Sequence, residues 1–151
     1  MTFTRRQLLG HSASIAGLAA VGFPIEPALA SAEGVQKLMT EFSGGKIPET
    51  GRITLTVPDI AENGSAVPVS VAVDSAMDGE DLVESVALYA DGNPNPAVAT
   101  FYFTALSGAA VVTTRIRLAK TQNVVAIAKM KDGSVFMDSR EVQVSIGGCS
   151  G

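Results

Sequence analysis

Alternation of apolar and polar residues with a period of two is the feature that most restricts the fold of this chain. After Gly51, apolar side chains recur at every second position in two stretches: Ile53, Leu55 and Val57, then Val67, Val69, Val71 and Val73. In a β-strand this spacing places such side chains on one face. Further strands are expected over residues 82–90, 97–106, 111–118, 124–130 and 135–146, with turn-forming residues between them, including 58–64, 93–96 and 131–133. About seven short strands with turns roughly every ten residues predict an all-β fold, an immunoglobulin-like antiparallel β-sandwich.

A short N-terminal helix is expected before the strands. Val35, Leu38, Met39 and Phe42 follow the spacing i, i+3, i+4 and i+7, which forms one apolar stripe on a helix. Ser31 is a suitable N-cap, and two consecutive glycines after residue 43 end the pattern. The stripe predicts that this helix lies against the domain or against a partner.

The first thirty residues resemble an export signal. Adjacent arginines at positions 5 and 6 precede an apolar run over residues 14–21, and residues 28–30 give a small-x-small cleavage site. Paired arginines in this setting indicate the twin-arginine route and therefore the periplasm. The run is interrupted by Gly17 and is shorter than the roughly 20 residues that a bilayer requires. We expect a signal peptide over residues 1–30, cleaved after Ala30, followed by a domain over residues 31–146 and a tail over residues 147–151.

Composition excludes several classes of function. The only histidine, His11, lies in the expected signal peptide, so the remaining chain has one cysteine and no histidine. Serine–histidine triads, cysteine–histidine dyads, histidine metal sites and multi-cysteine metal sites are excluded, and no cofactor is expected. A formal net charge of −4 argues against binding to a nucleic-acid backbone and gives no reason to expect attraction to an anionic membrane.

The lone cysteine, Cys149, lies in a tail of small residues: Gly147, Gly148, Ser150 and Gly151. Burial of Val142, Val144 and Ile146 is expected to anchor the last strand, after which no apolar side chain remains to be buried. An unpaired cysteine in an oxidising compartment indicates either intermolecular pairing or a free thiol. Because the nearest cation in the sequence is Arg140, we expect the thiol to keep an ordinary pKa and to be mostly protonated at neutral pH.

Four parts of the sequence together carry a resemblance to a known family. They are the twin-arginine leader, residues 58–69 (Pro-Asp-Ile-Ala-Glu-Asn-Gly-Ser-Ala-Val-Pro-Val), residues 114–119 (Thr-Arg-Ile-Arg-Leu-Ala) and the ending 144–149 (Val-Ser-Ile-Gly-Gly-Cys). With these parts the chain resembles the SoxY family, the sulfur-carrier subunits of the periplasmic thiosulfate-oxidising Sox system. Members of that family typically end in Gly-Gly-Cys-Gly-Gly, and Ser150 replaces one of these glycines here.

The resemblance implies a carrier rather than an enzyme. Cys149 would hold sulfur intermediates covalently, and Gly147, Gly148, Ser150 and Gly151 would make the arm flexible. The family pairs with a second β-sandwich subunit, SoxZ, as a heterodimer. A haem enzyme would join thiosulfate to the cysteine as an S-thiosulfonate, and a metal-dependent hydrolase would release sulfate. In some systems a molybdenum enzyme oxidises the remaining sulfur. A disulfide-linked dimer through Cys149 is the expected oxidised side product.

Other interpretations of the same residues remain open. The chain could be an exported immunoglobulin-like binding module with an incidental tail, or an interaction protein linked through its cysteine. A thiol redox protein is disfavoured because a resolving cysteine is missing.

For four further groups of residues we prefer a structural interpretation to a functional one. Arg115 and Arg117 are expected on a solvated strand face, with partner contact as the alternative. Residues 101–103 (Phe-Tyr-Phe) are interpreted as core plus surface. Asp59 and Glu62 are interpreted as turn residues. The acidic residues of segment 78–84 are interpreted as a solvated edge, because their spacing does not match a calcium loop.

Overall fold

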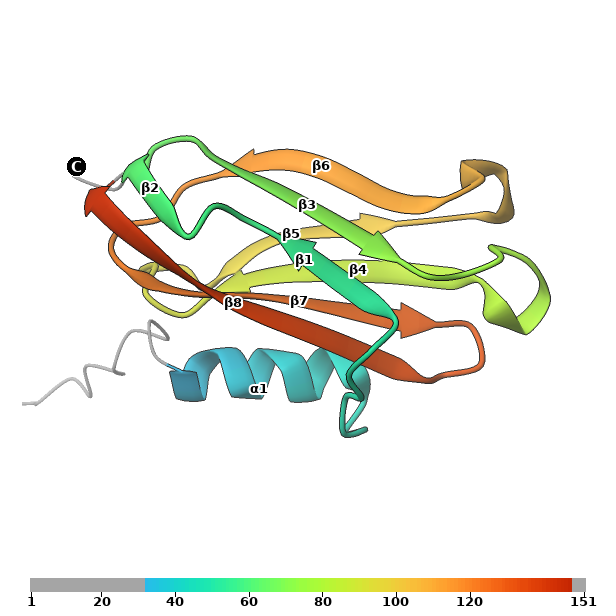
Figure 1. Ribbon diagram of the computed structural model, residues 1–151. Coiled ribbons are helices and arrows are strands. Elements are labelled where there is room, and N and C mark those ends of the chain that lie inside the picture. The colour runs from blue at the N-terminus through green and yellow to red at the C-terminus, as the bar shows by residue number, and fades with distance from the viewer. Residues whose placement is uncertain (1–31, 148–151) are drawn as a thin grey trace, which may run out of the picture.

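Two β-sheets face one another, and helix α1 lies against the outer face of the larger sheet (Figure 1). This computed structural model describes residues 32–147. The predicted signal peptide, its cleavage site, the predicted cap Ser31 and residues 148–151 lie outside the described residues. The elements are α1 (Ala32–Ser43), β1 (Ile53–Thr56), β2 (Ile60–Asn63), β3 (Val67–Val73), β4 (Val83–Ala90), β5 (Ala97–Tyr102), β6 (Ala110–Ile116), β7 (Gln122–Met130) and β8 (Val135–Ile146), with two short 3-10 turns at Gly79–Asp81 and Ala105–Ser107.

The smaller sheet has the strand order β1-β3-β6, and the larger sheet has the order β2-β8-β7-β4-β5. Strand β3 shows how the alternating pattern is used: Val67, Val69 and Val71 are each 1% exposed, whereas the residues between them are exposed or half-buried. Leu88 from β4 and Val124 from β7 meet these valines in one apolar core between the sheets. The predicted immunoglobulin-like sandwich is confirmed.

Strands β4 and β7 are buried on both faces. Their inner faces join the core between the sheets, and their outer faces pack against α1 through Ala87, Tyr89 and Ile127. On the helix, Val35 is 3% exposed and Met39 is 5% exposed, so the predicted stripe is the buried face. A strand covered on both faces loses its polar alternation, which explains the nearly continuous apolar residues of β4 and β7.

The helix ends where the two glycines predicted it would. Gly45 N–H donates to Thr40 O at 2.9 Å, and Gly44 N–H donates to Glu41 O at 3.3 Å. The φ angles of Gly44 and Gly45 are +65° and +84°, a region that residues with a Cβ rarely adopt. These bonds form the Schellman arrangement, which satisfies the last free carbonyls of a helix.

No helix within residues 32–147 has the length and apolar character needed to cross a membrane.

Two details of the predicted topology are wrong. Residues 58–64, expected as a turn, contain strand β2, and β2 pairs with β8 in parallel, so the sandwich is not wholly antiparallel. In β2 only Ala61 is buried, and a four-residue strand with one buried side chain leaves no visible period in the sequence. Asp59 and Glu62, expected as turn residues, therefore flank and occupy a strand.

The interpretations of the other three groups agree with the structure. Arg115 and Arg117 are both exposed. Phe101 and Phe103 pack against the core while Tyr102 is 81% exposed, which is the expected division between core and surface. In the acidic segment, Asp81 forms an ion pair with Arg52 at 2.6 Å. No cluster of three or more potential metal-ligating side chains occurs within residues 32–147.

Candidate functional site

Most of the predicted site lies beyond the last described residue. Cys149, Gly148, Ser150 and Gly151 are outside the described residues, and Gly147 is the last residue that is described. The structure therefore shows the part of the fold to which Cys149 is attached. We call residues 143–147 the tail root. They lie at one end of the sandwich, where the arrowheads of β8 and β2 point in the same direction (Figure 1).

Strand β2 holds one side of the tail root. Gln143 N–H donates to Asp59 O at 2.9 Å, and Gly64 N–H donates to Ile146 O at 2.7 Å. Between these bonds, Ala61 lies opposite Val144 in the parallel register. The segment that carries part of the family resemblance thus pairs with the last strand immediately before the cysteine-bearing tail.

The connection between β6 and β7 holds the other side. Strand β8 pairs with β7 as far as Val142, which lies opposite Gln122. Beyond that point the hydroxyl of Thr121 takes the place of a backbone acceptor, because Val144 N–H donates to Thr121 Oγ1 at 3.0 Å. Leu118 N–H also donates to Gly64 O at 2.8 Å, which ties this connection to β2. The tail root is therefore held by hydrogen bonds from both sides.

Gly147 lies directly on this connection. A Cβ at position 147 would overlap the carbonyl oxygen of Ala119 and would lie 3.2 Å from its carbonyl carbon. Such a contact with backbone atoms cannot be relieved by moving a flexible side chain. The family resemblance implies that Gly147 contributes flexibility. In the structure, any side chain at this position would clash with the backbone of Ala119.

The burial expected at the end of β8 is only partly correct. Val142 is fully buried and Val144 is half-buried, but Ile146 is 69% exposed. The three side chains share one face, as predicted, yet the strand extends past the end of the core. A period of two identifies the face of a strand but not how far along it the core reaches. Hydrogen bonds to β2 and to Thr121 hold the last residues of β8, and half-buried Val144 adds the only apolar packing beyond Val142.

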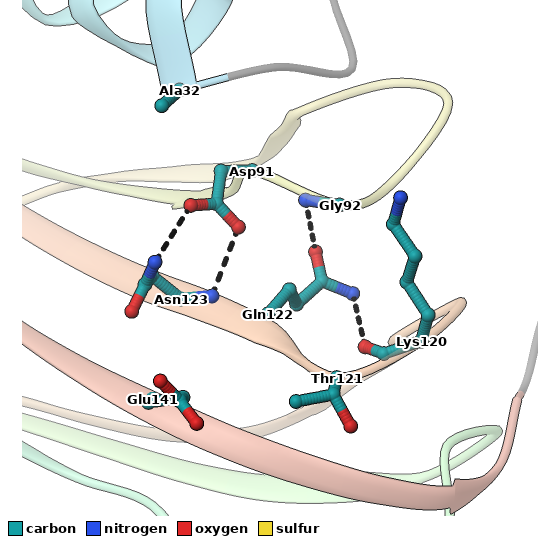
Figure 2. A pocket seen from close by; sticks show the side chains of 8 residues that line it. All are labelled: Ala32, Asp91, Gly92, Lys120, Thr121, Gln122, Asn123 and Glu141. Carbon is teal, nitrogen blue, oxygen red and sulfur yellow. Dashed lines mark hydrogen bonds between the residues drawn. The ribbon is translucent and has the colours of Figure 1, made fainter.

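The buried side chain of Asn93 forms hydrogen bonds to the connection between β6 and β7. Its Nδ2 donates to Arg117 O at 2.8 Å, and its Oδ1 accepts from Ala119 N–H and from Gln122 Nε2, both at 2.9 Å. Gln122 Nε2 also donates to Lys120 O at 3.0 Å, and Gln122 Oε1 accepts from Gly92 N–H at 2.6 Å (Figure 2). The sequence marked residues 93–96 only as a rigid loop. No local pattern could indicate a partner more than twenty residues away.

A polar hollow of about 350 Å³ lies beside this network (Figure 2). Asp91 and Asn123 lie side by side in its lining, where the backbone N–H and the Nδ2 of Asn123 donate to the carboxylate of Asp91 at 2.9 and 2.8 Å. Glu141 adds a second carboxylate, and Lys120 adds one ammonium group. With two carboxylates and one cation, the hollow does not favour a sulfonate-type anion.

Two comparisons with known proteins agree with one another. The family model described as "Sulfur oxidation protein SoxY" matches residues 39–149. The structure of the sulfur carrier protein SoxY from Chlorobium limicola f thiosulfatophilum is similar, with a TM-score of 0.62 and 29% sequence identity, over 77% of this chain and 100% of that chain. No curated protein sequence matches the chain.

Two superoxide reductases share only the fold. A variant of the superoxide reductase (neelaredoxin) from Ignicoccus hospitalis aligns with a TM-score of 0.52 and 20% identity, over 76% of this chain and 89% of that one. The enzyme from Nanoarchaeum equitans aligns with a TM-score of 0.53 and 13% identity, over 63% of this chain and 99% of that one. At these identities the similarity extends to the sandwich architecture and no further.

Proposed function

The chain belongs to the SoxY family of sulfur oxidation proteins, and on this premise we propose that it carries sulfur intermediates covalently on Cys149 for separate enzymes to process. The observation that supports this most directly is the tail root. The fold holds the chain by hydrogen bonds up to Ile146 and by close packing at Gly147, and Cys149 follows two residues later. The proposed carrier thiol is thus attached two residues beyond a point that the fold holds in place.

The length of the tail suits delivery of a small group. Two residues span about 7 Å at roughly 3.3–3.6 Å per residue, so Cys149 has a short reach beyond Gly147. Its neighbours Gly148, Ser150 and Gly151 have small side chains or none, which suits entry into a narrow channel. None of these neighbours supplies an acid, a base or a metal ligand, so the proposed chemistry belongs to the partner enzymes.

The proposed cycle has two balanced steps. In loading, the thiolate of Cys149 and the outer sulfur of thiosulfate form an S–S bond, giving a cysteine S-thiosulfonate, and two electrons pass to a haem enzyme. In hydrolysis, water cleaves the bond between sulfur and the sulfonate group. Sulfate and two protons leave, and a persulfide stays on Cys149. A molybdenum enzyme would oxidise that remaining sulfur in systems that contain one.

The location and partners form part of the same proposal. Residues 1–30 would direct twin-arginine export to the periplasm, and residues 31–146 would form the domain. Residues 147–151 would form the carrier arm, with Gly147 at its fixed base. The chain would form a heterodimer with a SoxZ-like subunit, and oxidation would link two copies through Cys149.

Intact-mass spectrometry tests the carrier proposal. The mature chain is incubated with thiosulfate, the SoxZ-like subunit and the loading enzyme, and its mass is measured with and without reductant. We expect a thiosulfonate adduct that reductant removes, no adduct on Cys149→Ser, and an undiminished adduct on the control Ser150→Gly. The absence of any adduct during turnover would favour the exported binding module instead.

A further inference from the structure

The proposed function gives no role to the loop between β4 and β5. Residues 92–96 read Gly-Asn-Pro-Asn-Pro, and the two prolines fix φ and remove two backbone donors. The loop lies at the same end of the sandwich as the tail root (Figure 1). Its residue Asn93 is only 7% exposed. Asparagine is mostly found at the surface of proteins, so its burial here has to be explained by its partners.

The partners of Asn93 lie in the connection between β6 and β7. Its Nδ2 donates to Arg117 O at 2.8 Å, and its Oδ1 accepts from Ala119 N–H at 2.9 Å. The same Oδ1 accepts from Nε2 of Gln122, and this Nε2 also donates to Lys120 O at 3.0 Å. One buried amide and its glutamine partner therefore hold the backbone of three residues of the connection.

The network around Asn93 is fully bonded and closely packed. Within residues 32–147, no buried side-chain nitrogen or oxygen lacks a hydrogen-bond partner. A polar network whose members are all satisfied makes a site rigid. A Cβ at Gly92 would lie 2.8 Å from Cβ of Gln122, so the loop and the connection are also in direct steric contact. Figure 2 shows the bonds that join Gly92, Gln122 and Lys120.

The connection in turn contacts the tail root. Ala119, whose N–H bonds to Asn93, places its carbonyl oxygen where a Cβ of Gly147 would be. Two residues later, Thr121 Oγ1 accepts from Val144 N–H at 3.0 Å. Because close-packed groups pass a displacement on to their neighbours, a shift of the connection would move the tail root as well.

We propose that Asn93 is a positioning residue for the carrier thiol: through the connection between β6 and β7 it sets the place and orientation of Gly147, from which the chain continues to Cys149. The inference rests on the proposed function and adds to it a residue outside the tail. The side-chain bonds of Asn93 end at the connection and at Gln122, so its action on the tail root is indirect.

The position of Gly147 matters because only two residues lead from it to Cys149. A tail root that is no longer fixed must be ordered again each time an enzyme binds the carrier. Ordering the backbone of one residue corresponds to about a tenfold loss of affinity. The loss of Asn93 should therefore raise the KM of a loading enzyme for this chain more than it lowers kcat.

Hydrogen exchange on the mature chain, measured by NMR without any partner, tests the structural part. In Asn93→Ala the connection loses its bonds, so we expect the amides of Val144 and Gly64 to exchange at least about tenfold faster. The control Val83→Ala empties a fully buried site in β4, opposite Met130 at the far end of β7. It lowers global stability without touching the connection, so these two amides should exchange as in the wild type.

Steady-state loading, with the same components as the mass-spectrometry test, tests the functional part. We expect Asn93→Ala to raise KM for the chain about tenfold with kcat nearly unchanged. Val83→Ala should leave both constants unchanged. So should Asn123→Ala, the same substitution beside the network, since Asn123 Nδ2 bonds to Asp91 instead. Alkylation of Cys149 by iodoacetamide should proceed at one rate in all variants, because the expected change concerns position and not the thiol.

Two further substitutions keep the inference testable if Asn93→Ala does not fold. Asn93→Asp keeps the shape and an acceptor oxygen and loses the donor to Arg117 O, so we expect the same changes at a smaller size. Thr121→Val keeps the shape of an exposed side chain but cannot accept from Val144 N–H. It should speed exchange of the Val144 amide and raise KM, whereas Thr121→Ser retains the hydroxyl and should match the wild type.

Two results would overturn the inference. Wild-type exchange of the Val144 and Gly64 amides in a folded Asn93 variant would show that Asn93 does not hold the tail root. A KM raised equally in Val83→Ala would show that the effect follows stability and not position. A wild-type chain that is not loaded at all would overturn the proposed function instead. The exchange measurement needs no enzyme and would still decide the role of Asn93 at the tail root.

Discussion

In the centre of the larger sheet, β4 and β7 are held by side chains buried on both faces, whereas the tail root is held by backbone hydrogen bonds. Leu88 and Ile127 are fully buried, but Ile146 at the end of β8 is 69% exposed. Apolar burial contributes to the stability of the whole domain, while a few hydrogen bonds at an edge govern a local opening. The comparison teaches that the end of the chain can be perturbed without unfolding the domain.

The largest expected effect concerns the centre of the sheet. Leu88→Ala removes a fully buried side chain, so we expect the free energy of unfolding to fall by about 2–5 kcal/mol. Urea unfolding followed by circular dichroism measures it. The matched control is Leu106→Ala, whose side chain is 97% exposed, and it should change stability by less than about 0.5 kcal/mol. Equal losses in the two variants would contradict the division between centre and surface.

A smaller and local effect is expected at the tail root. In Gly147→Ala the new Cβ meets the carbonyl of Ala119, and we expect the root to shift at a local cost of about 1–3 kcal/mol. Hydrogen exchange at the amides of Gly64 and Val144, which bond to Ile146 O and Thr121 Oγ1, measures the shift as faster exchange. The global unfolding midpoint should change much less than in Leu88→Ala.

Gly148→Ala is the matched comparison for the root, since it makes the same change one residue later. We expect it to leave the exchange of the Gly64 and Val144 amides unchanged. Faster exchange in Gly148→Ala but not in Gly147→Ala would show that the fixed part of the chain ends elsewhere.

The smallest expected effect is a pH dependence near the start of β1. Hydrogen bonds from Ala76 N–H and from the Arg52 guanidinium lower the pKa of Asp81 below its usual value. A carboxyl whose pKa is lower in the folded state stabilises the fold above its unfolded pKa, and this contribution is lost as the pH falls through the folded pKa. The stability difference between wild type and Asp81→Asn should therefore shrink from pH 7 towards acid.

Urea midpoints over a pH series measure this difference. The comparison variant Arg52→Gln removes the guanidinium but keeps the bond from Ala76, which is the largest single cause of the lowered pKa, so part of the pH dependence should remain. A difference between wild type and Asp81→Asn that stays constant with pH would show that Asp81 does not contribute in this way.

Sequence reasoning was accurate where side chains repeat with a simple period. The valines of β3 and the stripe from Val35 to Phe42 identified their elements and buried faces, because periodicity follows directly from strand and helix geometry. It was wrong at β2 and at Ile146. A strand with one buried residue has no period, and the end of a core is set by the length of the facing sheet.

At the candidate site, the sequence identified Cys149 and its small neighbours but not their support. The bonds of Asn93 reach residues 117, 119 and 122, and Thr121 reaches Val144. These contacts join segments more than twenty residues apart, which no local pattern records.

By itself, the sequence determined a β-sandwich with one covering helix and a lone thiol beyond the last strand. Each of these follows from side-chain spacing or from composition. Only the tertiary structure decided that β2 runs parallel to β8, that Gly147 lies against the carbonyl of Ala119, and that Thr121 bonds to Val144. The physical reason is that such contacts join backbones, whose hydrogen-bonding groups are the same at almost every residue, so that only their arrangement in space selects the partners.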